Sequence, residues 1–394
     1  MHGLTADEVL RLLRSLLPEE LTRGRGHRET TPDPAAISAD TRLDDSTVRA
    51  DSLDRLNLAS TLNRLFSLHE TGIEDRLLAV RRIGDMAELI AEASGHTSGL
   101  VFHTSGSTGD PQPHHHPWAA IAQEGEAMAK HFAGYRRVLA WLPLHHVYGF
   151  MLGIALPRAL SCEVVDGPSA PPALFHEPRR DDLIVTVPAR WRYLLDAGHR
   201  FRGGSGVSST APLEASTQQG LLEAGLQALA EIYGATETGG IGIRWAPSSA
   251  YTLMPHWCRD ADSNLERILP DGSALTVTPL DRLDWLDERT FSPQGRIDDI
   301  VQIGGVNVSP THVAEQIERH DQVAEATVRP FWESSQRRLK AFIVPATPGA
   351  DPSELRERLE KWLWQQLPAA ERPVRLSFGS KLPRNSMGKL QDWD

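Results

Sequence analysis

The stretch LVFHTSGSTG, residues 100–109, joins an apolar run to a loop of small residues. Leu100, Val101 and Phe102 are typical of a buried strand that ends at a turn. The loop 104–109 offers backbone N–H groups and hydroxyls that can surround phosphate oxygens, because no large side chain stands in the way. It lacks the Gly-Lys-Ser/Thr ending of a Walker loop, and such a hexamer taken alone more often marks a flexible turn.

The sequence on either side of this loop changes its periodicity twice. Residues 1–95 contain four segments with helical spacing of apolar residues, the first starting at Thr5 and expected to end at Pro18. Residues 97–297 alternate short apolar runs with helix-like stretches, which is typical of an α/β layered core. Residues 298–394 predict a small α+β domain whose first helix is capped by Ser309. We therefore expect a multidomain chain with these three parts.

Composition narrows the class of partner. The 394 residues include 41 basic and 52 acidic side chains, a net charge of −11, and no basic run, which disfavours nucleic acid and anionic membrane surfaces. Cys162 and Cys258 lie far apart and suit a reducing cytoplasm better than a disulfide framework. No run approaches about 18 apolar residues, so we expect neither a signal peptide nor a membrane span. Small molecules or proteins are the expected partners.

Further motifs follow the small-residue loop in a fixed order: YGATE at 233–237, GRIDD at 295–299, Gly304-Gly305, and LPRNSMGK at 382–389. Together they resemble the acyl-adenylate-forming superfamily, which includes acyl-CoA synthetases, adenylation domains of peptide synthetases and luciferases. The resemblance covers residues 100 to 394. It implies that a carboxylic acid and ATP form an acyl-adenylate and pyrophosphate, and that the acyl group then passes to a phosphopantetheine thiol with release of AMP.

The resemblance assigns roles around ATP, whose phosphates need charge neutralisation and a fixed pose. The small-residue loop would hold the β- and γ-phosphates, Tyr233 would stack on adenine beside Ala211, and Thr236 would bond the phosphate. Glu237 would hold Mg²⁺, a hard cation that prefers oxygen ligands. The full ATP-binding set implied by the resemblance is Thr104, Ser105, Gly106, Ser107, Thr108, Gly109, Ala211, Tyr233, Asp281 and Arg296.

The C-terminal part resembles a lid that rotates between two half-reactions. Asp298 would be its hinge, Lys389 would stabilise the adenylation transition state, and Gly305 would let a pantetheine arm pass close to the backbone. His146, within LPLHHVYG at 142–149, resembles a gate beside the acyl site. The plainer alternatives are a solvated tail lysine and a structural histidine.

The predicted nucleotide site departs from the family pattern in two places, and a histidine run follows its loop. The small-residue loop continues with Asp110-Pro111-Gln112-Pro113, so a phosphate-facing lysine is missing. The Tyr-x-Thr-Gly-Asp motif for the ribose is absent, and Asp281 is assigned to that role by the 13 positions that separate it from Gly295. The run His114-His115-His116 is interpreted as a surface loop, because adjacent histidines in regular structure cannot all face one ion.

The front of the chain also departs, because the resemblance leads us to expect well over a hundred residues ahead of the phosphate loop. Asp51-Ser52-Leu53 at the start of a predicted helix resembles an acyl carrier protein, in which Ser52 would receive 4′-phosphopantetheine from a phosphopantetheinyl transferase. Ser52 is also a plain helix N-cap candidate. Arg55 and Arg64 are unusual for a carrier, so a degenerate carrier that is no longer modified remains an alternative.

The sequence therefore predicts a carrier-like helical domain (1–95), a shortened adenylation core (97–297) and a mobile lid (298–394). The expected enzyme transfers an aromatic acid such as a hydroxybenzoate to an acyl carrier protein, as in aryl-polyene pathways. The carrier would be the front domain of the same chain (in cis) or a separate protein (in trans). Two alternatives stay open. One is an acyl-CoA or aryl-CoA synthetase, and the other is a pseudo-enzyme that docks carriers.

Overall fold

The computed structural model describes residues 2–25, 32–103, 112–167, 178–261, 264–279, 281–296, 300–333, 336–347, 351–383 and 392–393. For residues 23–25, 295 and 296 it describes the backbone alone. The described residues form two compact units. The first comprises those within 1–104, 113–278 and 285–292, and the second mainly those within 279–284 and 293–394.

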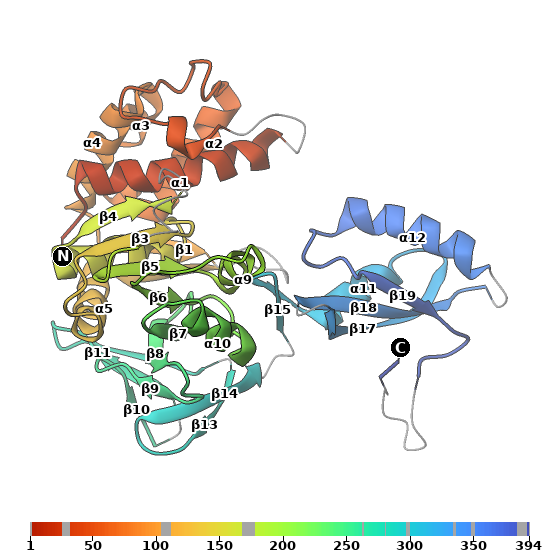
Figure 1. Ribbon diagram of the computed structural model, residues 1–394. Coiled ribbons are helices and arrows are strands. Elements are labelled where there is room, and N and C mark those ends of the chain that lie inside the picture. The colour runs from red at the N-terminus through yellow and green to blue at the C-terminus, as the bar shows by residue number, and fades with distance from the viewer. Residues whose placement is uncertain are drawn as a thin grey trace. The chain divides into compact units, whose positions relative to one another are not determined.

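A nine-stranded sheet organises the first unit, with the strand order β13-β14-β9-β8-β7-β6-β5-β3-β4 among the described residues (Figure 1), although 281–284 of β13 and 293–296 of β14 fall within the ranges of the second unit. The parallel part consists of β3 (Arg137–Trp141), β4 (Glu163–Asp166), β5 (Asp182–Thr186), β6 (Ser205–Ser208) and β7 (Leu229–Ala235). The antiparallel part consists of β8 (Gly239–Trp245), β9 (Tyr251–Leu253), β13 (Asp281–Trp285) and β14 (Thr290–Arg296). Strands β5 and β6 are buried along their whole length because both faces of the sheet are covered, and Leu183, Ile184 and Val185 have no exposed surface.

Helices cover the parallel strands. On one face α9 (Pro188–Asp196) and α10 (Ala215–Glu223) bring Trp191 and Leu221 against Leu139 and Ile184 of the sheet. The other helices of the core are α5 (Trp118–His131) and the succession α6 (Val147–Phe150), the π-helical turn η3 (Met151–Ala155) and α7 (Leu156–Leu160). This confirms the predicted α/β layered core.

Two smaller sheets complete the core. Strand β1 (Gly99–His103) pairs antiparallel with β2 (Pro113–Pro117), which confirms the predicted strand ahead of the small-residue loop. The histidine run lies in β2, so its interpretation as a surface loop is wrong: side chains alternate along the strand, and His116 points inward and is buried. The second sheet comprises β10 (Cys258–Arg259), β11 (Leu265–Ile268) and β12 (Ala274–Val277).

Four helices form at the front as predicted: α1 (Ala6–Arg25), α2 (Ser52–Phe66), α3 (Glu74–Ala79) and α4 (Ile83–Ser94). The short 3₁₀ turns η1 (Pro34–Ala36) and η2 (Leu68–Glu70) lie between them. The expected end of the first helix at Pro18 is wrong. A proline inside a helix costs about 3 kcal/mol, but the apolar stripe continues past it through the buried Leu21, and burial of the longer helix offsets that cost.

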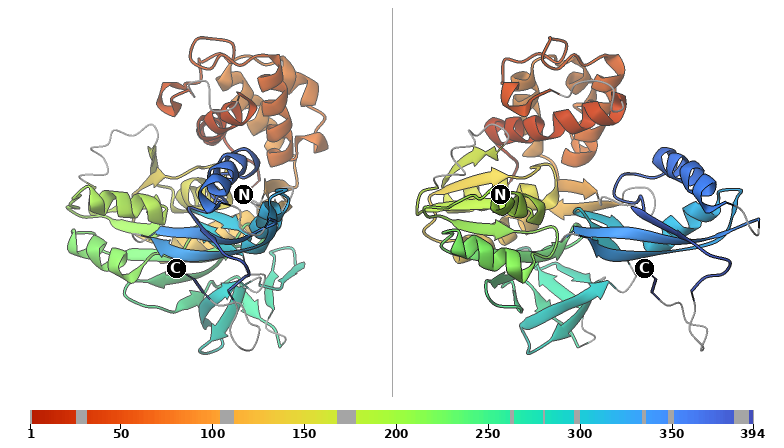
Figure 2. Two further views of the ribbon diagram at one scale, coloured as in Figure 1. Left: turned by 90° about the vertical axis from the view of Figure 1, so that its right-hand side faces the viewer. Right: turned by 45° about the vertical axis from the view of Figure 1, so that its right-hand side comes forward.

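The front helices belong to the same compact unit as the core and gather at the β4 edge of the sheet (Figures 1 and 2). Arg11 of α1 donates to both carboxylate oxygens of Asp166 in β4, at 2.8–3.0 Å, and to the carbonyl of Gly153 at 2.7 Å. Arg158 of α7 donates to Glu8 at 2.8 Å. These buried polar contacts fasten α1 to the core, so the structure does not separate residues 1–95 as a compact unit of their own.

The second unit is the predicted small α+β domain. It contains the hairpin β15 (Val301–Ile303) and β16 (Val306–Val308), α11 (Pro310–Glu318), β17 (Val323–Glu333), β18 (Gln336–Pro345), α12 (Pro352–Gln366) and β19 (Arg375–Phe378). Ser309 caps α11 as expected, because its hydroxyl accepts the N–H of His312 at 3.1 Å. Helix α12 lies across one face of the β17-β18-β19 sheet (Figure 2), and Leu359 is fully buried there.

Candidate active site

The loops after the parallel strands bring several predicted residues to one edge of the sheet. His146 follows β3, Ala211 follows β6, and Thr236 and Glu237 follow β7. Neighbouring strands β5, β6 and β7 run parallel, so their carboxyl ends lie at the same edge. In open α/β sheets this edge is where ligands bind. The structure therefore places these four predicted residues where the fold favours a site.

The turn between β7 and β8 is held on both sides. The N–H of Ala235 donates to the hydroxyl of Thr238 at 3.0 Å, and His116 Nε2 lies 2.7 Å from the carbonyl oxygen of Thr236. Burial lowers the pKa of His116 to about 4, so the ring is neutral at neutral pH and Nε2–H donates to that carbonyl. The third histidine of the run thus positions the segment that carries Thr236 and Glu237.

Glycines are required at this turn. Gly239 has a φ of +69°, in the left-handed region that favours glycine. A Cβ at Gly234 would lie 2.0 Å from the carbonyl oxygen of Gly239 and 2.2 Å from the hydroxyl of Tyr148. The spacing of small residues in YGATETGG is therefore a steric requirement of this turn.

A buried ion pair, Glu124–Arg267, also supports the turn between β7 and β8. Glu124 of α5 accepts the N–H of Gly240 at 2.8 Å, and its other carboxylate oxygen lies 3.5 Å from a guanidinium nitrogen of Arg267 in β11. Arg267 also donates to Gln123 Oε1 at 2.7 Å. Burial raises the pKa of Glu124, and the guanidinium opposes that rise. The sequence alone does not indicate this pair, because its two members lie far apart in the chain and neither belongs to a motif.

Aromatic rings surround Tyr233 at the end of β7. Its ring centroid lies 5.6 Å from that of Tyr251 and 5.5 Å from that of Phe291, and Tyr233 is half-buried. Next to this strand, Ser209 donates to the carbonyl of Ile232 at 2.9 Å. Tyr251 and Phe291 are buried and their rings are tilted against that of Tyr233, so within this cluster Tyr233 is the partly exposed ring on which a base can stack.

The segment after β6 is strained and firmly held. Thr210 has a φ of +80°, which is an outlier for a β-branched residue and is typical of functional sites. Three residues on, the N–H of Leu213 donates to the buried carboxylate of Glu231 at 3.0 Å, and Arg244 donates to the same carboxylate at 2.9 Å. Glu231 therefore fixes the loop that contains Ala211 against β7.

His146 occupies the N-cap position of α6, and its side chain is 51% exposed. Two residues on, Tyr148 is buried, and its pKa is raised by burial and by the nearby carboxylates of Glu124 and Glu237. The half-buried carboxylate of Glu237 has the oxygen chemistry that Mg²⁺ prefers.

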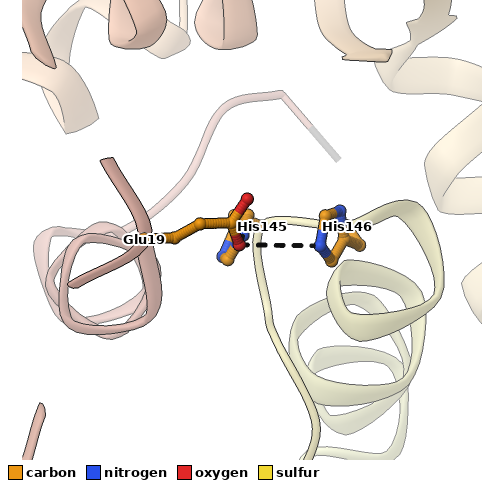
Figure 3. A group of neighbouring side chains, drawn as sticks. All are labelled: Glu19, His145 and His146. Atoms are coloured by element: carbon orange, nitrogen blue, oxygen red, sulfur yellow. Dashed lines mark hydrogen bonds and ion pairs between the residues drawn. The ribbon is translucent and has the colours of Figure 1, made fainter. Parts of the chain in front are cut away.

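Figure 3 shows His146 beside His145 and Glu19 of α1. Glu19 Oε2 lies 2.8 Å from His145 Nε2 and 3.9 Å from His146 Nε2. The hydroxyl of Ser15, one turn before Glu19, lies 3.0 Å from His145 Nδ1 and accepts the N–H of Leu144 at 2.8 Å. Helix α1 thus holds the loop that carries the predicted gate.

The remaining predicted residues are placed as follows. Asp281 is half-buried at the start of β13. Gly305 lies in the β15–β16 turn with a φ of +86°, and a Cβ there would meet no atom of the described residues within 4 Å. Gly304 and Gly305 both have positive φ, as a two-residue hairpin turn requires. Arg296 ends β14, with its backbone alone described. Further predicted site residues lie outside the described residues: Thr104, Ser105, Gly106, Ser107, Thr108, Gly109, Asp298 and Lys389.

Ser52 is the first residue of α2 and is exposed. The N-cap is Asp51 and not Ser52: Asp51 accepts the N–H of Asp54 at 2.8 Å, while Asp54 accepts the N–H of Asp51 at 3.1 Å. This reciprocal capping box is a local reason for Asp-Ser-Leu at a helix start. Arg55 donates to the Ser52 hydroxyl at 3.3 Å.

The family comparison matches both parts of the chain. The family described as AMP-binding enzyme matches residues 18–271, and that described as AMP-binding enzyme C-terminal domain matches residues 312–389. The chain belongs to the AMP-binding enzyme family. This confirms the predicted superfamily, and with it an AMP-forming acid–thiol ligase that adenylates a carboxylic acid; ATP and Mg²⁺ are the cofactors expected of this family.

Two relatives match along their whole length. The chain is 65% identical over 391 residues to 4-coumarate–CoA ligase of Halorhodospira halophila, covering 99% of this chain and 100% of the relative. It is 38% identical to 4-coumarate–CoA ligase of Rhodobacter capsulatus, covering 98% of this chain and 100% of the relative. The short front that sequence analysis noted is therefore shared by these relatives.

Solved structures share the fold at low identity. An o-succinylbenzoate CoA synthetase of Bacillus subtilis superposes with a TM-score of 0.59 at 19% identity, covering 84% of this chain and 80% of that chain. An amide bond synthetase of Marinactinospora thermotolerans superposes with a TM-score of 0.60 at 18% identity, covering 97% of this chain and 92% of that chain.

These findings do not support the carrier interpretation of the front. The AMP-binding match begins at residue 18 and runs through Ser52, and the whole-length relatives bear the names of CoA ligases. These whole-length relatives support neither an aryl-polyene type nor a transfer to an acyl carrier protein. None of the helices in the described ranges combines the length and apolar character that a bilayer crossing requires.

Proposed function

We propose that the protein is a 4-coumarate–CoA ligase, which joins a 4-hydroxycinnamic acid to CoA at the expense of ATP. The 65% identity to the Halorhodospira halophila ligase, along the full length of both chains, carries this proposal. The alternative of an aryl-CoA synthetase thereby replaces the carrier-loading interpretation. The proposed substrate is still an aromatic acid, but it is a cinnamate and not the benzoate predicted from the sequence.

The proposed reaction has two steps. A carboxylate oxygen of the acid attacks the α-phosphorus of ATP, and pyrophosphate leaves with the electrons of the broken P–O bond. The CoA thiolate then attacks the acyl carbonyl, and AMP leaves. Bound Mg²⁺ would neutralise phosphate charge in the first step, with Glu237 as its protein ligand.

The placement of the described residues supports the following roles as part of this proposal. Tyr233 and the 209–211 segment would hold adenine, because a ring cluster and a fixed backbone lie side by side there. Thr236 and Glu237 would face the phosphates, held in place by His116 and Glu124. His146 would border the acyl group after β3. For Asp281, Arg296, Asp298, Gly305 and Lys389 the roles implied by the family resemblance are retained as part of the proposal.

The acid specificity is tested with purified protein, ATP, Mg²⁺ and CoA against 4-coumarate, cinnamate, 4-hydroxybenzoate and octanoate. Formation of the thioester is followed together with carboxylate-dependent pyrophosphate exchange. We expect 4-coumarate to give the highest kcat/KM. A preference for 4-hydroxybenzoate would refute the substrate assignment, and absence of exchange with every acid would favour the pseudo-enzyme.

The acceptor is tested separately. The same assay compares CoA with a phosphopantetheinylated carrier protein, and intact-protein mass spectrometry checks Ser52 after treatment with a phosphopantetheinyl transferase and CoA. We expect CoA to be the acceptor, Ser52 to stay unmodified, and Ser52→Ala to ligate at the wild-type rate. A covalent acyl thioester on the wild-type chain that is lost in Ser52→Ala would restore the carrier interpretation.

A further inference from the structure

We propose that Glu19, His145 and His146 form a binding site for a first-row transition-metal cation such as Zn²⁺, distinct from the Mg²⁺ that accompanies ATP. The site joins helix α1 to the loop after β3 (Figure 3). It contains one carboxylate and two imidazoles, a donor set that suits Zn²⁺.

The distances between the three donor atoms fit one small ion. Glu19 Oε2 lies 2.8 Å from His145 Nε2 and 3.9 Å from His146 Nε2, and each of the three residues offers one ligand atom within 4.8 Å of those of the other two. Bonds of about 2.0–2.1 Å in a tetrahedral site put neighbouring donor atoms roughly 3.3 Å apart. The two observed carboxylate–imidazole distances lie on either side of this spacing. Each would therefore have to change by less than about 1 Å for the side chains to bind one ion.

The two adjacent histidines can face one ion because they do not lie in regular structure. Both precede α6, which begins at Val147, and their ring centroids lie 4.4 Å apart. Adjacent histidines in a strand, such as those of the run 114–116, cannot all face one ion because their side chains alternate. His145 and His146 lie in a loop, where this restriction does not apply.

Ser15 supplies the outer support that metal-bound histidines usually have. Its hydroxyl oxygen accepts the N–H of Leu144 at 2.8 Å and lies 3.0 Å from His145 Nδ1. A hydroxyl oxygen has two lone pairs, so it can also accept Nδ1–H. That tautomer leaves the lone pair of His145 Nε2 directed to the cation. Without metal, the other tautomer donates Nε2–H to Glu19, so a metal would replace an existing hydrogen bond.

The site has an entry path and an open position. The side chains of Glu19 and His146 are 41% and 51% exposed, whereas that of His145 is 7% exposed. Three protein ligands leave a fourth position for water. Mg²⁺ demands oxygen ligands and dehydrates reluctantly, so millimolar Mg²⁺ in the reaction would not compete for this site.

Binding is tested on untagged, chelator-treated wild-type protein in excess Mg²⁺. Zn²⁺ is titrated against a competing chromophoric chelator, and Co²⁺ is used as a spectroscopic probe of tetrahedral coordination. We expect one equivalent bound, a Co²⁺ spectrum typical of a tetrahedral site, and a metal-dependent rise in Tm. Affinity should fall at least tenfold in Glu19→Gln, His145→Ala and His146→Ala, and about 10-fold to 100-fold in Ser15→Ala.

Two matched variants control for other effects. Glu8→Gln removes a carboxylate of the same helix that bridges to Arg158 of the core, and His115→Ala removes an exposed histidine from the run in β2. Both should bind Zn²⁺ as the wild type does. The proposal is overturned if the wild type binds no tighter than His146→Ala, or if Glu8→Gln weakens binding as much as Glu19→Gln while each variant keeps its fold. The triad is then a hydrogen-bonded cluster only.

The consequence for catalysis rests on the proposed function, in which His146 borders the acyl group. A cation on His146 would hold this side chain toward α1, so Zn²⁺ should inhibit pyrophosphate exchange in the wild type. For each protein, activity is expressed relative to its own metal-free rate. On that scale, the Zn²⁺ concentration that halves activity should be at least tenfold higher for Glu19→Gln than for the wild type. Binding without inhibition would overturn the gate position of His146 and leave the metal site standing.

Discussion

The substitution Arg267→Met tests whether the buried pair beneath the β7–β8 turn supports the nucleotide site. The side chains of Arg267 and Glu124 are 1% and 3% exposed, and Glu124 accepts the N–H of Gly240 at 2.8 Å. Met is close to Arg in length but brings no charge. The variant leaves the Glu124 carboxylate in an apolar environment without its guanidinium.

The expected cost follows from this burial. Removing one partner of a buried ion pair costs about 3–5 kcal/mol, because an uncompensated charge remains. For a unit of this size, about 1 kcal/mol shifts Tm by roughly 2–4 °C, so the shift should be roughly 6–20 °C. Burial already raises the pKa of Glu124, and loss of Arg267 removes the opposing influence. A carboxyl whose folded-state pKa is raised loses stability as pH increases from its unfolded-state pKa to the raised one, so the deficit of the variant should grow with pH.

The assay combines calorimetry with pyrophosphate exchange at several ATP concentrations. Because Glu124 holds the backbone of Gly240 next to the turn with Thr236 and Glu237, we expect the KM for ATP to rise at temperatures where the variant is folded. Arg259→Met is the matched control. Arg259 lies on the neighbouring strand β10, is exposed, and covers the Trp285 ring at 4.8 Å, so its loss should cost less than about 1 kcal/mol.

A double substitution decides whether the ion pair is the cause. Glu124→Gln keeps an acceptor for the N–H of Gly240 and removes the charge. The double variant Glu124→Gln/Arg267→Met should therefore lose less unfolding free energy than the two single variants lose together, by at least about 1 kcal/mol. Strict additivity, or an Arg267→Met variant whose Tm and KM for ATP match those of Arg259→Met, would refute the reasoning.

Four further predictions concern single residues. Glu237→Gln should raise the Mg²⁺ concentration needed for pyrophosphate exchange, since an amide is a poorer ligand; an unchanged titration would assign the metal to another carboxylate. Asp281→Ala should raise the KM for ATP by the loss of a charged hydrogen bond, about 1.5–3 kcal/mol, and a change confined to the KM of the acid would show that the spacing misplaced it. Lys389→Ala should slow adenylation by about 10² to 10³ and spare transfer from preformed adenylate; equal loss in both steps would argue against a rotating lid. Burial raises the pKa of Glu371 from the usual 4.5 to about 7, so the second unit should lose stability as pH rises from 4.5 through 7, whereas Glu371→Gln should unfold at a Tm that stays level across that window.

Local sequence was sufficient to establish the family and most of the secondary structure. Short-range rules predicted the Ser309 cap, the strand before the small-residue loop, and the four front helices. The order of YGATE, GRIDD and LPRNSMGK indicated the family by resemblance, and the family comparison confirms it. These features depend on neighbours in the chain, which a sequence displays directly.

Only the tertiary structure showed which residues support the site and that the front helices pack on the core. His116 holds Thr236 from 120 positions away, and Glu124 meets Arg267 although they are far apart in the chain, because β2, α5 and β11 pack around one turn. Glu19 reaches His145 only because α1 continues past Pro18 and packs on the β3 loop. A helix that looked like part of a separate carrier domain is thereby part of the core. Contacts of this kind arise from the packing of whole elements, which periodicity and spacing along one chain do not encode.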